Sequence, residues 1–494
     1  MQHTRGKSPA FASPDEYTQA RNLLETANYT ELGIAEALKV DKRAPPRTGD
    51  PILIRRTAGG SRLDTLLRLF LICIPVEREA VCRALHPMEL EQWVDAGLIR
   101  VENGMASAAL RLSRLKHLVL AHDFRLHTGE HWPDFVMGIG GATRTQAMTT
   151  VRKRCSLALD MGTGSGVLAF LAADHCDRVY AVDRNARAIG VARFNAMLNG
   201  ITNVEFRQGS FFEPVENLQF DLVVADPPFV ISPPSEFLYL HGGMRGDQFC
   251  RKLAFDASRQ LRECGYFQML FNWAHYTGRD ASEDLATWFE GNGCDTWILR
   301  LSTQDAASYA STWIEHIYGE DRGNADPLFN QWMNFYETEG IEAMSLGLVT
   351  MQRCSKRVNW IAIEDAPLSL KEECGPDIEE RFECRDCSAN NDDVHLLDVL
   401  LRCSPNVRLQ YRCEPDASEW RMTESELLLD RALPFSVKAD PFTAGLLVRC
   451  DGQTSIRNLL PDFANAVGSD VETVTPVCLK SVRQLLERGF LRPA

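Results

Sequence analysis

The chain has 494 residues, 45% of them hydrophobic and 24% charged, which is the composition of an ordinary globular protein. That composition excludes a mainly disordered, collagen-like or coiled-coil protein, and the length predicts about three domains. The net charge of −14 disfavours a protein that grips long stretches of phosphate backbone, although it leaves room for a local basic patch.

Cysteine usage and hydropathy indicate a reducing compartment. The 15 cysteines are odd in number and scattered from Cys73 to Cys478, which indicates a reduced interior rather than a disulfide scaffold. The first 17 residues hold no apolar signal core, and the most apolar stretch, residues 66–75, is interrupted by Arg68 and too short to span a bilayer. We therefore expect a cytoplasmic protein with no membrane segment, and the sequence does not indicate its oligomeric state.

Residues 1–130 are predicted to form a helical domain. Residues 1–150 carry a net charge of +2, and Asn103-Gly104 predicts a hairpin turn between two short strands. Helices followed by a small hairpin resemble a winged-helix recognition module, and a small helical cap on an enzyme is the alternative. Apolar residues at helical spacing predict helices over 15–27, 30–40, 63–73, 76–85 and 87–95.

Residues 131–365 are predicted to form an α/β core. From about Ser156, short apolar strands alternate with helical stretches, a pattern typical of a parallel sheet with helices on both faces. Later runs at 296–301, 345–353 and 357–364 are expected to add antiparallel strands. The predicted fold is Rossmann-like and doubly wound, with a mostly parallel seven-stranded sheet. The parallel strands are expected at 156–161, 178–183, 203–209, 220–226 and 265–273.

Two segments follow the core, and residues 361–494 carry a net charge of −9. Residues 366–420 are predicted to be an acidic, cysteine-containing connecting region. Residues 421–494 are predicted to form a second small winged-helix-like module, because an apolar lead-in precedes two helical stretches.

One cysteine pair has a spacing seen in metal sites. Cys384 and Cys387 have the spacing of half a zinc site. Cys403 and Cys413 lie ten residues apart and do not supply a matching pair. No metal ligand set is therefore predicted, and zinc binding by Cys384 and Cys387 stays an open question.

The most specific motif is the glycine-rich segment SLALDMGTGSGVLAFLAA. A hydrophobic strand is expected to end at Asp160, and a turn presents Gly162, Gly164 and Gly166 before an apolar helix. Glycine is needed there because a side chain would block both the tight turn and the approach of a ligand to the backbone amides of the helix. The next strand ends at Asp183, 21 residues after Gly162, where a carboxylate can accept hydrogen bonds from both hydroxyls of a ribose.

A second motif, Asp226-Pro227-Pro228-Phe229, follows the fourth strand. Together with the G-x-G-x-G spacing and an acidic residue two positions before the first glycine, it resembles the class I S-adenosylmethionine-dependent methyltransferases over residues 131–363. Within that class it is similar to the Asn/Asp-Pro-Pro-aromatic group, which methylates planar nitrogens. The resemblance implies S-adenosylmethionine as cofactor, with Asp160 facing its methionine end.

The resemblance also implies a set of cofactor contacts. Asp183 would hold the ribose, Ser210 and Phe211 would lie beside the adenine, and the segment with Gly140 and Thr143 would close over the methionine end. The implied cofactor-binding residues are Asp160, Gly162, Thr163, Gly164, Gly166, Asp183, Arg184, Ser210, Phe211, Asp226 and Gly140.

The chemistry of a planar nitrogen explains the second motif. An amide or exocyclic amine is a weak nucleophile because its lone pair is delocalised. The Asp226 side chain and the Pro227 carbonyl can accept its two hydrogens and orient it toward a methyl group, while Phe229 stacks on the plane. These three residues are the predicted catalytic residues. With the flap expected over residues 232–250, the predicted substrate contacts are Pro228, Phe229, Tyr239, His241 and Arg245.

Three functions remain compatible with the sequence. The core resembles the glutamine-modifying methyltransferases, and the acidic charge favours a side-chain amide in a protein or peptide as acceptor. Those relatives carry Asn where this chain has Asp226, and aspartate is common among nucleobase-modifying relatives, so an RNA or DNA base is the alternative acceptor. A cofactor-binding scaffold without catalysis is the third reading.

Overall fold

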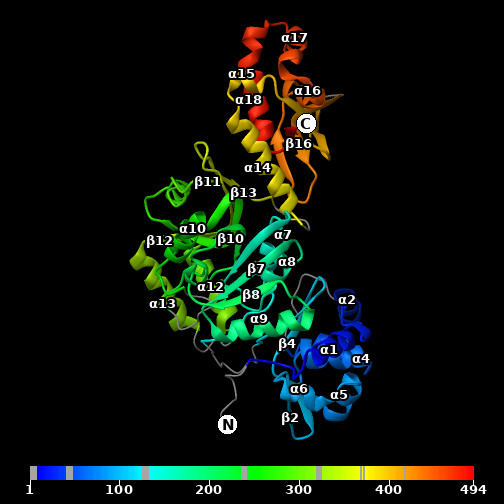
Figure 1. Ribbon diagram of the computed structural model, residues 1–494. Coiled ribbons are helices and arrows are strands. Elements are labelled where there is room, and N and C mark those ends of the chain that lie inside the picture. Colours follow the sequence, from blue (N-terminus) through cyan, green and yellow to red (C-terminus); the bar gives the residue numbers. More distant parts are fainter. Residues whose placement is uncertain are drawn as a thin grey trace. The chain divides into compact units, whose positions relative to one another are not determined.

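The computed structural model describes residues 8–39, 48–124, 133–234, 242–318, 325–367, 370, 373–416 and 419–494 (Figure 1). Backbone contacts divide the chain into two compact units. The first unit comprises residues 1–147, 153–354 and 361–364, and the second comprises residues 148–152, 355–360 and 365–494.

The first unit begins with short helices and small antiparallel sheets. Asn103 and Gly104 both have positive φ, as the predicted hairpin turn requires, and β1, β3 and β2 pair in that order. The winged-helix interpretation of this region stays a prediction. The elements are α1 (Pro14–Thr26), α2 (Glu31–Leu38), α3 (Pro51–Arg56), α4 (Arg62–Leu66), a π-helical turn (Leu67–Leu71), β1 (Val76–Glu77), α5 (Arg78–Leu85), α6 (Leu90–Asp95), β2 (Ile99–Glu102), β3 (Met105–Ala108), β4 (Arg111–Leu115) and β5 (Leu118–His122).

The α/β part of the first unit alternates strands and helices as predicted. Its elements are α7 (Gly141–Thr149), β6 (Cys155–Met161), α8 (Val167–Ala173), β7 (Cys176–Asp183), α9 (Ala186–Asn199), β8 (Val204–Gln208), a 3₁₀ turn (Glu213–Val215), β9 (Phe220–Ala225), α10 (Gln248–Gln260), β10 (Leu261–Tyr276), α11 (Ala281–Ala286), β11 (Cys294–Asp305), α12 (Ala306–Tyr318), α13 (Ala325–Glu339), β12 (Ile341–Arg353) and β13 (Ile361–Asp365).

These strands form one eight-stranded sheet in the order β13-β11-β12-β10-β9-β6-β7-β8 (Figure 1). Strands β6 to β10 are mutually parallel, and β12 runs antiparallel to both β10 and β11. The sheet has eight strands where seven were predicted, and β13, which corresponds to the run expected at 357–364, is an edge strand. It is held there by Ile361 and Ile363, which pack on the hydrophobic core, and by Glu364, which accepts a hydrogen bond from Trp297 Nε1 of β11 at 2.9 Å.

Burial shows that both faces of the sheet are covered. Residues 158–161 of β6 and 222–225 of β9 are buried without interruption, although successive side chains point to opposite faces. Helices α10 and α11 pack over the core on one face, and helices α8 and α9 contact β6, β7 and β8. Long hydrophobic runs in the sequence therefore correspond to central strands.

The N-terminal helices share a core with the sheet domain through α9. Phe194 and Leu198 of α9 belong to the same buried cluster as Tyr17 of α1. The Arg21 guanidinium also donates a hydrogen bond to the Leu198 carbonyl at 2.7 Å. This packing ties residues before position 130 to the α/β part of the first unit.

The second unit contains helices and two three-stranded sheets, β18-β14-β19 and β15-β16-β17, around one core. The sequence predicted a domain boundary at residue 420. In the structure, β15, which ends before that position, pairs with β16, which contains it. The winged-helix interpretation of its last part stays a prediction. The elements are α14 (Gly375–Asn390), α15 (Asp393–Leu396), β14 (Leu400–Cys403), β15 (Val407–Asp416), β16 (Glu419–Leu429), β17 (Phe435–Lys438), α16 (Pro441–Arg449), β18 (Asp451–Ser455), α17 (Ile456–Ala466), α18 (Val471–Glu487) and β19 (Leu491–Pro493).

Within the described ranges, none of the helices combines the length and the apolar character needed to cross a membrane.

Candidate active site

Three neighbouring strands bring the predicted motifs to one edge of the sheet. In the parallel register, Met161 of β6 is paired with Val182 of β7 and with Ala225 of β9. Gly162, Asp183 and Asp226 are the next residues on the three strands. Because the carboxyl ends of parallel strands meet at one edge, these residues collect in the crevice where α/β sheets bind ligands.

The glycine-rich loop takes the backbone conformations that favour glycine. Gly162, Gly164 and Gly166 have φ values of 78°, 53° and 93°. A Cβ atom on Gly166 would lie 2.3 Å from the Phe170 ring, so this glycine also permits α8 to pack closely against the loop. The buried Asn195 amide of α9 donates a hydrogen bond to the Ser165 carbonyl at 2.9 Å and fixes the far end of the loop.

Asp160 lies almost completely buried beneath the glycine-rich loop. Its Oδ2 accepts hydrogen bonds from Thr163 Oγ1 at 2.7 Å and from the Ala169 amide at 2.9 Å. Its Oδ1 is buried and has no hydrogen-bond partner in the described part of the chain. Burial raises the pKa of Asp160 to about 7. An unpaired carboxylate oxygen that lines a pocket is suited to a ligand ammonium group, as the predicted methionine end requires.

Asp183 is held by backbone amides on both sides. Its Oδ2 accepts a hydrogen bond from the Gly164 amide at 2.9 Å, and its Oδ1 accepts one from the Asn185 amide at 2.8 Å. Burial raises the pKa of this carboxyl group, while the two backbone hydrogen bonds lower it. The side chain is therefore fixed at the junction of the glycine-rich loop and α9.

Asp226 directly follows β9 and faces α7, the helix that precedes β6. Its Oδ2 accepts a hydrogen bond from Thr143 Oγ1 of α7 at 2.9 Å. Burial raises the pKa of Asp226 to about 6, and the Thr143 hydrogen bond opposes that change. Phe229, three residues later, meets the indole of Trp313 edge to face at 6.2 Å between ring centroids.

A single cavity of about 440 Å³ joins these groups. Its volume falls within the range of small-molecule sites. It also reaches α10 and α12 through Phe249 and Trp313. The predicted residues that line it are Gly140, Thr143, Asp160, Gly162, Thr163, Gly164, Asp183, Arg184, Ser210, Phe211, Asp226, Pro227, Pro228 and Phe229.

Two other predicted residues, Gly166 and Arg245, are not among the described residues that line the cavity. Gly166 caps α8 and contributes through packing. Arg245 forms an ion pair with Glu339 at 2.6 Å. Tyr239 and His241 lie outside the described residues, so their predicted substrate contacts stay predictions.

Sequence reasoning missed one side of the cavity. Trp313 and His316 of α12 line it, as do Phe249 and Leu253 of α10. The Phe249 ring lies 4.8 Å from that of Phe211, the residue expected beside an adenine. Aromatic residues on amphipathic helices were the only signal in the sequence, and that pattern is equally typical of an ordinary core.

Cys384 and Cys387 lie one helical turn apart on α14. Burial raises the pKa of the Cys384 thiol to about 12 and also raises that of Cys387. Within the described ranges, neither residue belongs to a group of three or more candidate metal ligands. The described residues therefore add no third ligand to the pair noted in the sequence.

Comparisons with known proteins match two parts of the chain. A family model described as a methyltransferase domain matches residues 155–312, and one described as a domain of unknown function matches residues 26–109. The release factor glutamine methyltransferase of Aliivibrio fischeri is 44% identical over 75 residues, 15% of this chain and 26% of that protein. The enzyme of the same name from Xylella fastidiosa is 33% identical over 131 residues, 23% of this chain and 46% of that protein.

Two further comparisons give weaker likeness. The ribosomal protein L11 methyltransferase of Lactobacillus johnsonii is 32% identical over 99 residues, 19% of this chain and 31% of that protein. A solved methyltransferase structure from Pyrococcus furiosus aligns with a TM-score of 0.27 and 18% identity, over 43% of this chain and 82% of that chain. The chain spans less than half the length of the curated relatives named here. The domain match and the curated relatives support a methyltransferase domain over residues 155–312, the part of the chain that holds the parallel strands of the α/β sheet.

Proposed function

We propose that this chain transfers the methyl group of S-adenosylmethionine to a planar nitrogen, the side-chain amide of a glutamine or asparagine in a protein or peptide. The observation that carries the proposal is that Asp226, Pro227 and Phe229 line the same cavity as Asp160 and Asp183. The names of the two glutamine methyltransferases support an amide acceptor.

Different residues of this chain would bind different parts of the cofactor. The free Oδ1 of Asp160 would pair with the ammonium group, and Asp183 would accept hydrogen bonds from the ribose hydroxyls. The backbone amides around Gly164 and the rings of Phe211 and Phe249 would enclose the remainder. When bound, the cofactor supplies a methyl group on a sulfonium, which is a strong electrophile.

The acceptor is oriented by the residues that follow β9. One hydrogen of the amide nitrogen is donated to the Asp226 carboxylate, whose second oxygen is occupied by Thr143, and the other hydrogen is donated to the Pro227 carbonyl. Both hydrogen bonds direct the nitrogen and place negative charge where positive charge develops. Phe229 and Trp313 provide aromatic surface for the planar group.

Asp226 also has a role after the methyl group has moved. The nitrogen then carries one hydrogen too many, and a nearby base must remove a proton from it. With a pKa of about 6, Asp226 is ionised at neutral pH and is a better base than an ordinary aspartate. The carboxylate therefore orients the substrate first and accepts its proton second.

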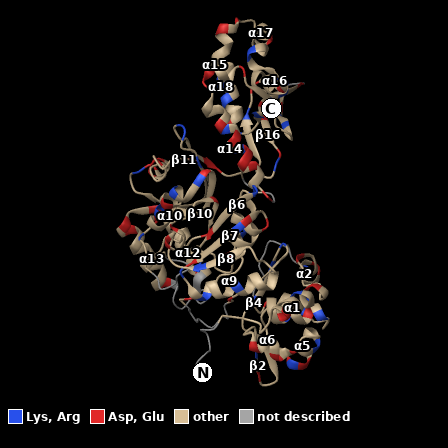
Figure 2. Cartoon of the chain, in the orientation of Figure 1, with Lys and Arg blue, Asp and Glu red and all other residues tan. Residues whose placement is uncertain are grey.

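Charge favours a protein acceptor over a nucleic acid. In the part of the chain that the structure describes, Lys and Arg are interspersed with Asp and Glu along the elements (Figure 2). A nucleic-acid enzyme is expected to show a basic track to its pocket. One observation supports a nucleobase as second candidate: aspartate stands at position 226, where glutamine-modifying relatives have asparagine.

Asp226 variants test the proposal. We expect Asp226→Ala to abolish transfer of labelled methyl to macromolecules in a cell extract while S-adenosylmethionine binding is retained. Asp226→Asn keeps an oxygen acceptor but cannot take the proton, so it should retain part of the activity. Glu91→Ala, which removes an exposed ion pair with Arg78, should change neither property. Loss of cofactor binding and transfer together in both Asp226 variants would assign Asp226 a structural role instead.

A further inference from the structure

The amino-terminal ends of β6 and β7 hold a cluster that the cofactor site does not use. Cys155 begins β6, Cys176 begins β7, and His175 immediately precedes Cys176. Cys155 and Cys176 are paired directly across the parallel ladder. The glycine-rich loop follows β6 at its other end, so this cluster lies at the opposite edge of the sheet from the candidate active site.

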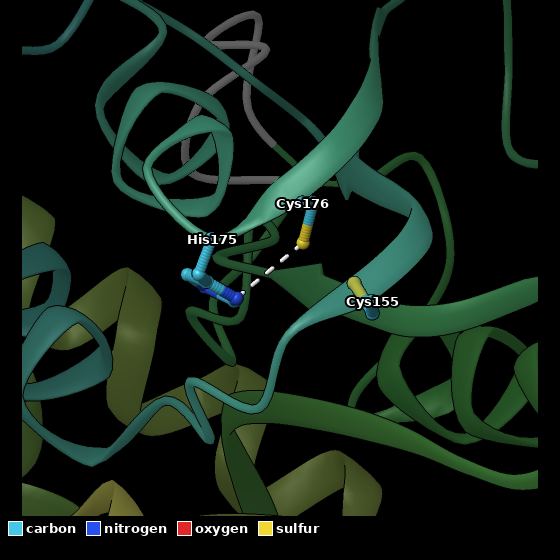
Figure 3. Close-up of side chains that lie close together, drawn as sticks. All are labelled: Cys155, His175 and Cys176. Atoms are coloured by element: carbon cyan, nitrogen blue, oxygen red, sulfur yellow. Dashed lines mark hydrogen bonds between the residues drawn. The ribbon is translucent and has the colours of Figure 1, made fainter.

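The three side chains converge closely enough to share one ion. One ligand atom from each residue lies within 4.8 Å of the other two, and His175 Nδ1 is 3.4 Å from Cys176 Sγ. Figure 3 shows the two sulfur atoms and the imidazole ring facing one another. A tetrahedral zinc ion with Zn–S bonds near 2.3 Å and Zn–N bonds near 2.0 Å separates its ligand atoms by about 3.3–3.8 Å. Small side-chain rotations would bring the cluster to that geometry.

We propose that Cys155, Cys176 and His175 bind a thiophilic divalent cation of the zinc class. Two thiolates and one imidazole are the donor set that such ions prefer. The Lys153 carbonyl, 3.0 Å from His175 Nδ1, or a solvent molecule supplies the fourth ligand. Cys155 and His175 are half-buried, so solvent reaches the cluster.

The surroundings of the cluster suit an ion better than a disulfide. His175 Nδ1 is hydrogen-bonded to the Lys153 carbonyl at 3.0 Å, and its Nε2 is buried without a hydrogen-bond partner in the described part of the chain, so binding an ion would cost the imidazole the Lys153 hydrogen bond alone. A disulfide between the two cysteines would leave the imidazole beside a neutral sulfur atom that has no hydrogen to donate to its nitrogen.

The ion would act as a cross-link. It would join the first residue of β6 to the turn between α8 and β7, where the Cys155 amide already donates a hydrogen bond to the His175 carbonyl at 3.2 Å. Because it binds the folded chain and not the unfolded one, it should stabilise the fold in proportion to the logarithm of its concentration. This role is independent of the proposed methyl transfer.

Metal titration of the full chain tests the proposal. Reduced, chelator-treated and desalted protein is titrated with Zn²⁺ against a chromophoric chelator. We expect one ion per chain, a raised melting temperature, and loss of both effects in Cys155→Ser, Cys176→Ser and His175→Asn. Cys264→Ser, at an exposed cysteine, and Cys387→Ser, at the pair noted in the sequence, are matched controls that should bind as the unaltered chain does.

Cobalt provides a readout that needs no variant. Co²⁺ added to the unaltered chain should give a sulfur-to-metal charge-transfer absorption band that Zn²⁺ abolishes. Three results would overturn the proposal: no such band and no zinc binding, zinc binding that the three variants leave intact, or a Cys155–Cys176 disulfide that resists alkylation in protein that binds no metal.

Discussion

Asp183 gives the most quantitative test of the cofactor site. Its carboxylate is fixed by the Gly164 amide at 2.9 Å and the Asn185 amide at 2.8 Å, which leaves its remaining lone pairs for the two ribose hydroxyls. A hydrogen bond to a charged group contributes about 1.5–3 kcal/mol. Taking the lower value for each of two bonds, Asp183→Ala should weaken S-adenosylmethionine binding by about 3 kcal/mol, which is roughly a hundredfold.

Calorimetric titration of the purified chain measures this effect. Asp183→Asn keeps one oxygen acceptor and loses the charge, so it should weaken binding by about tenfold, which is one such hydrogen bond. Glu205→Ala removes an ion pair with Arg207, and both residues lie on β8, the strand next to β7. This variant should leave the affinity for the cofactor unchanged. A folded Asp183→Ala protein that binds the cofactor as tightly as the unaltered chain would refute the reasoning.

The same substitution affects stability less than its hydrogen bonds suggest. Asp183→Ala removes the partners of two backbone amides, which costs free energy of unfolding. Burial raises the pKa of this carboxyl group, so removing the charge returns part of that cost. The net loss should be about 1–3 kcal/mol, measured by denaturant unfolding. The variant is therefore expected to fold and to be testable.

Three further predictions concern the glycine-rich loop and two carboxyl groups of the cavity. Gly166→Ala forces a Cβ into the Phe170 ring at φ 93° and should lower the free energy of unfolding by about 3 kcal/mol, seen in the denaturation midpoint. A cationic ligand prefers the ionised form of Asp160, and because its pKa is about 7 this carboxylate becomes protonated below that pH. The affinity for the cofactor should therefore fall about tenfold between pH 8 and pH 6. Asp160→Asn should remove this pH dependence. Thr143→Val removes a hydrogen bond that favours ionised Asp226, so the acidic limb of the transfer rate should move to higher pH, with roughly a threefold loss at pH 6.

The sequence predicts this edge of the sheet well because its signals are local. Glycines in fixed positions, an aspartate at a strand end and two consecutive prolines each constrain a few residues, and parallel strands bring their carboxyl ends together. Asp160, Asp183 and Asp226 were therefore predicted together, and all three line one cavity.

The remainder depends on packing between distant segments, which a single sequence does not display. Trp313 reaches the cavity from a helix far along the chain, and Arg245 pairs with Glu339 rather than lining the cavity. Cys155 and Cys176 meet only because β6 and β7 pair in one register.

The chemical identity of the methylated product tests the central claim most directly. The purified chain is incubated with S-adenosylmethionine labelled in its methyl group and a cell extract, and the labelled macromolecules are recovered. The proposed amide acceptor predicts label that protease releases, nuclease does not, and strong acid converts to volatile methylamine. Label that nuclease releases as a methylated base, or no transfer at all by an active-site-intact chain that binds the cofactor, would contradict the proposal.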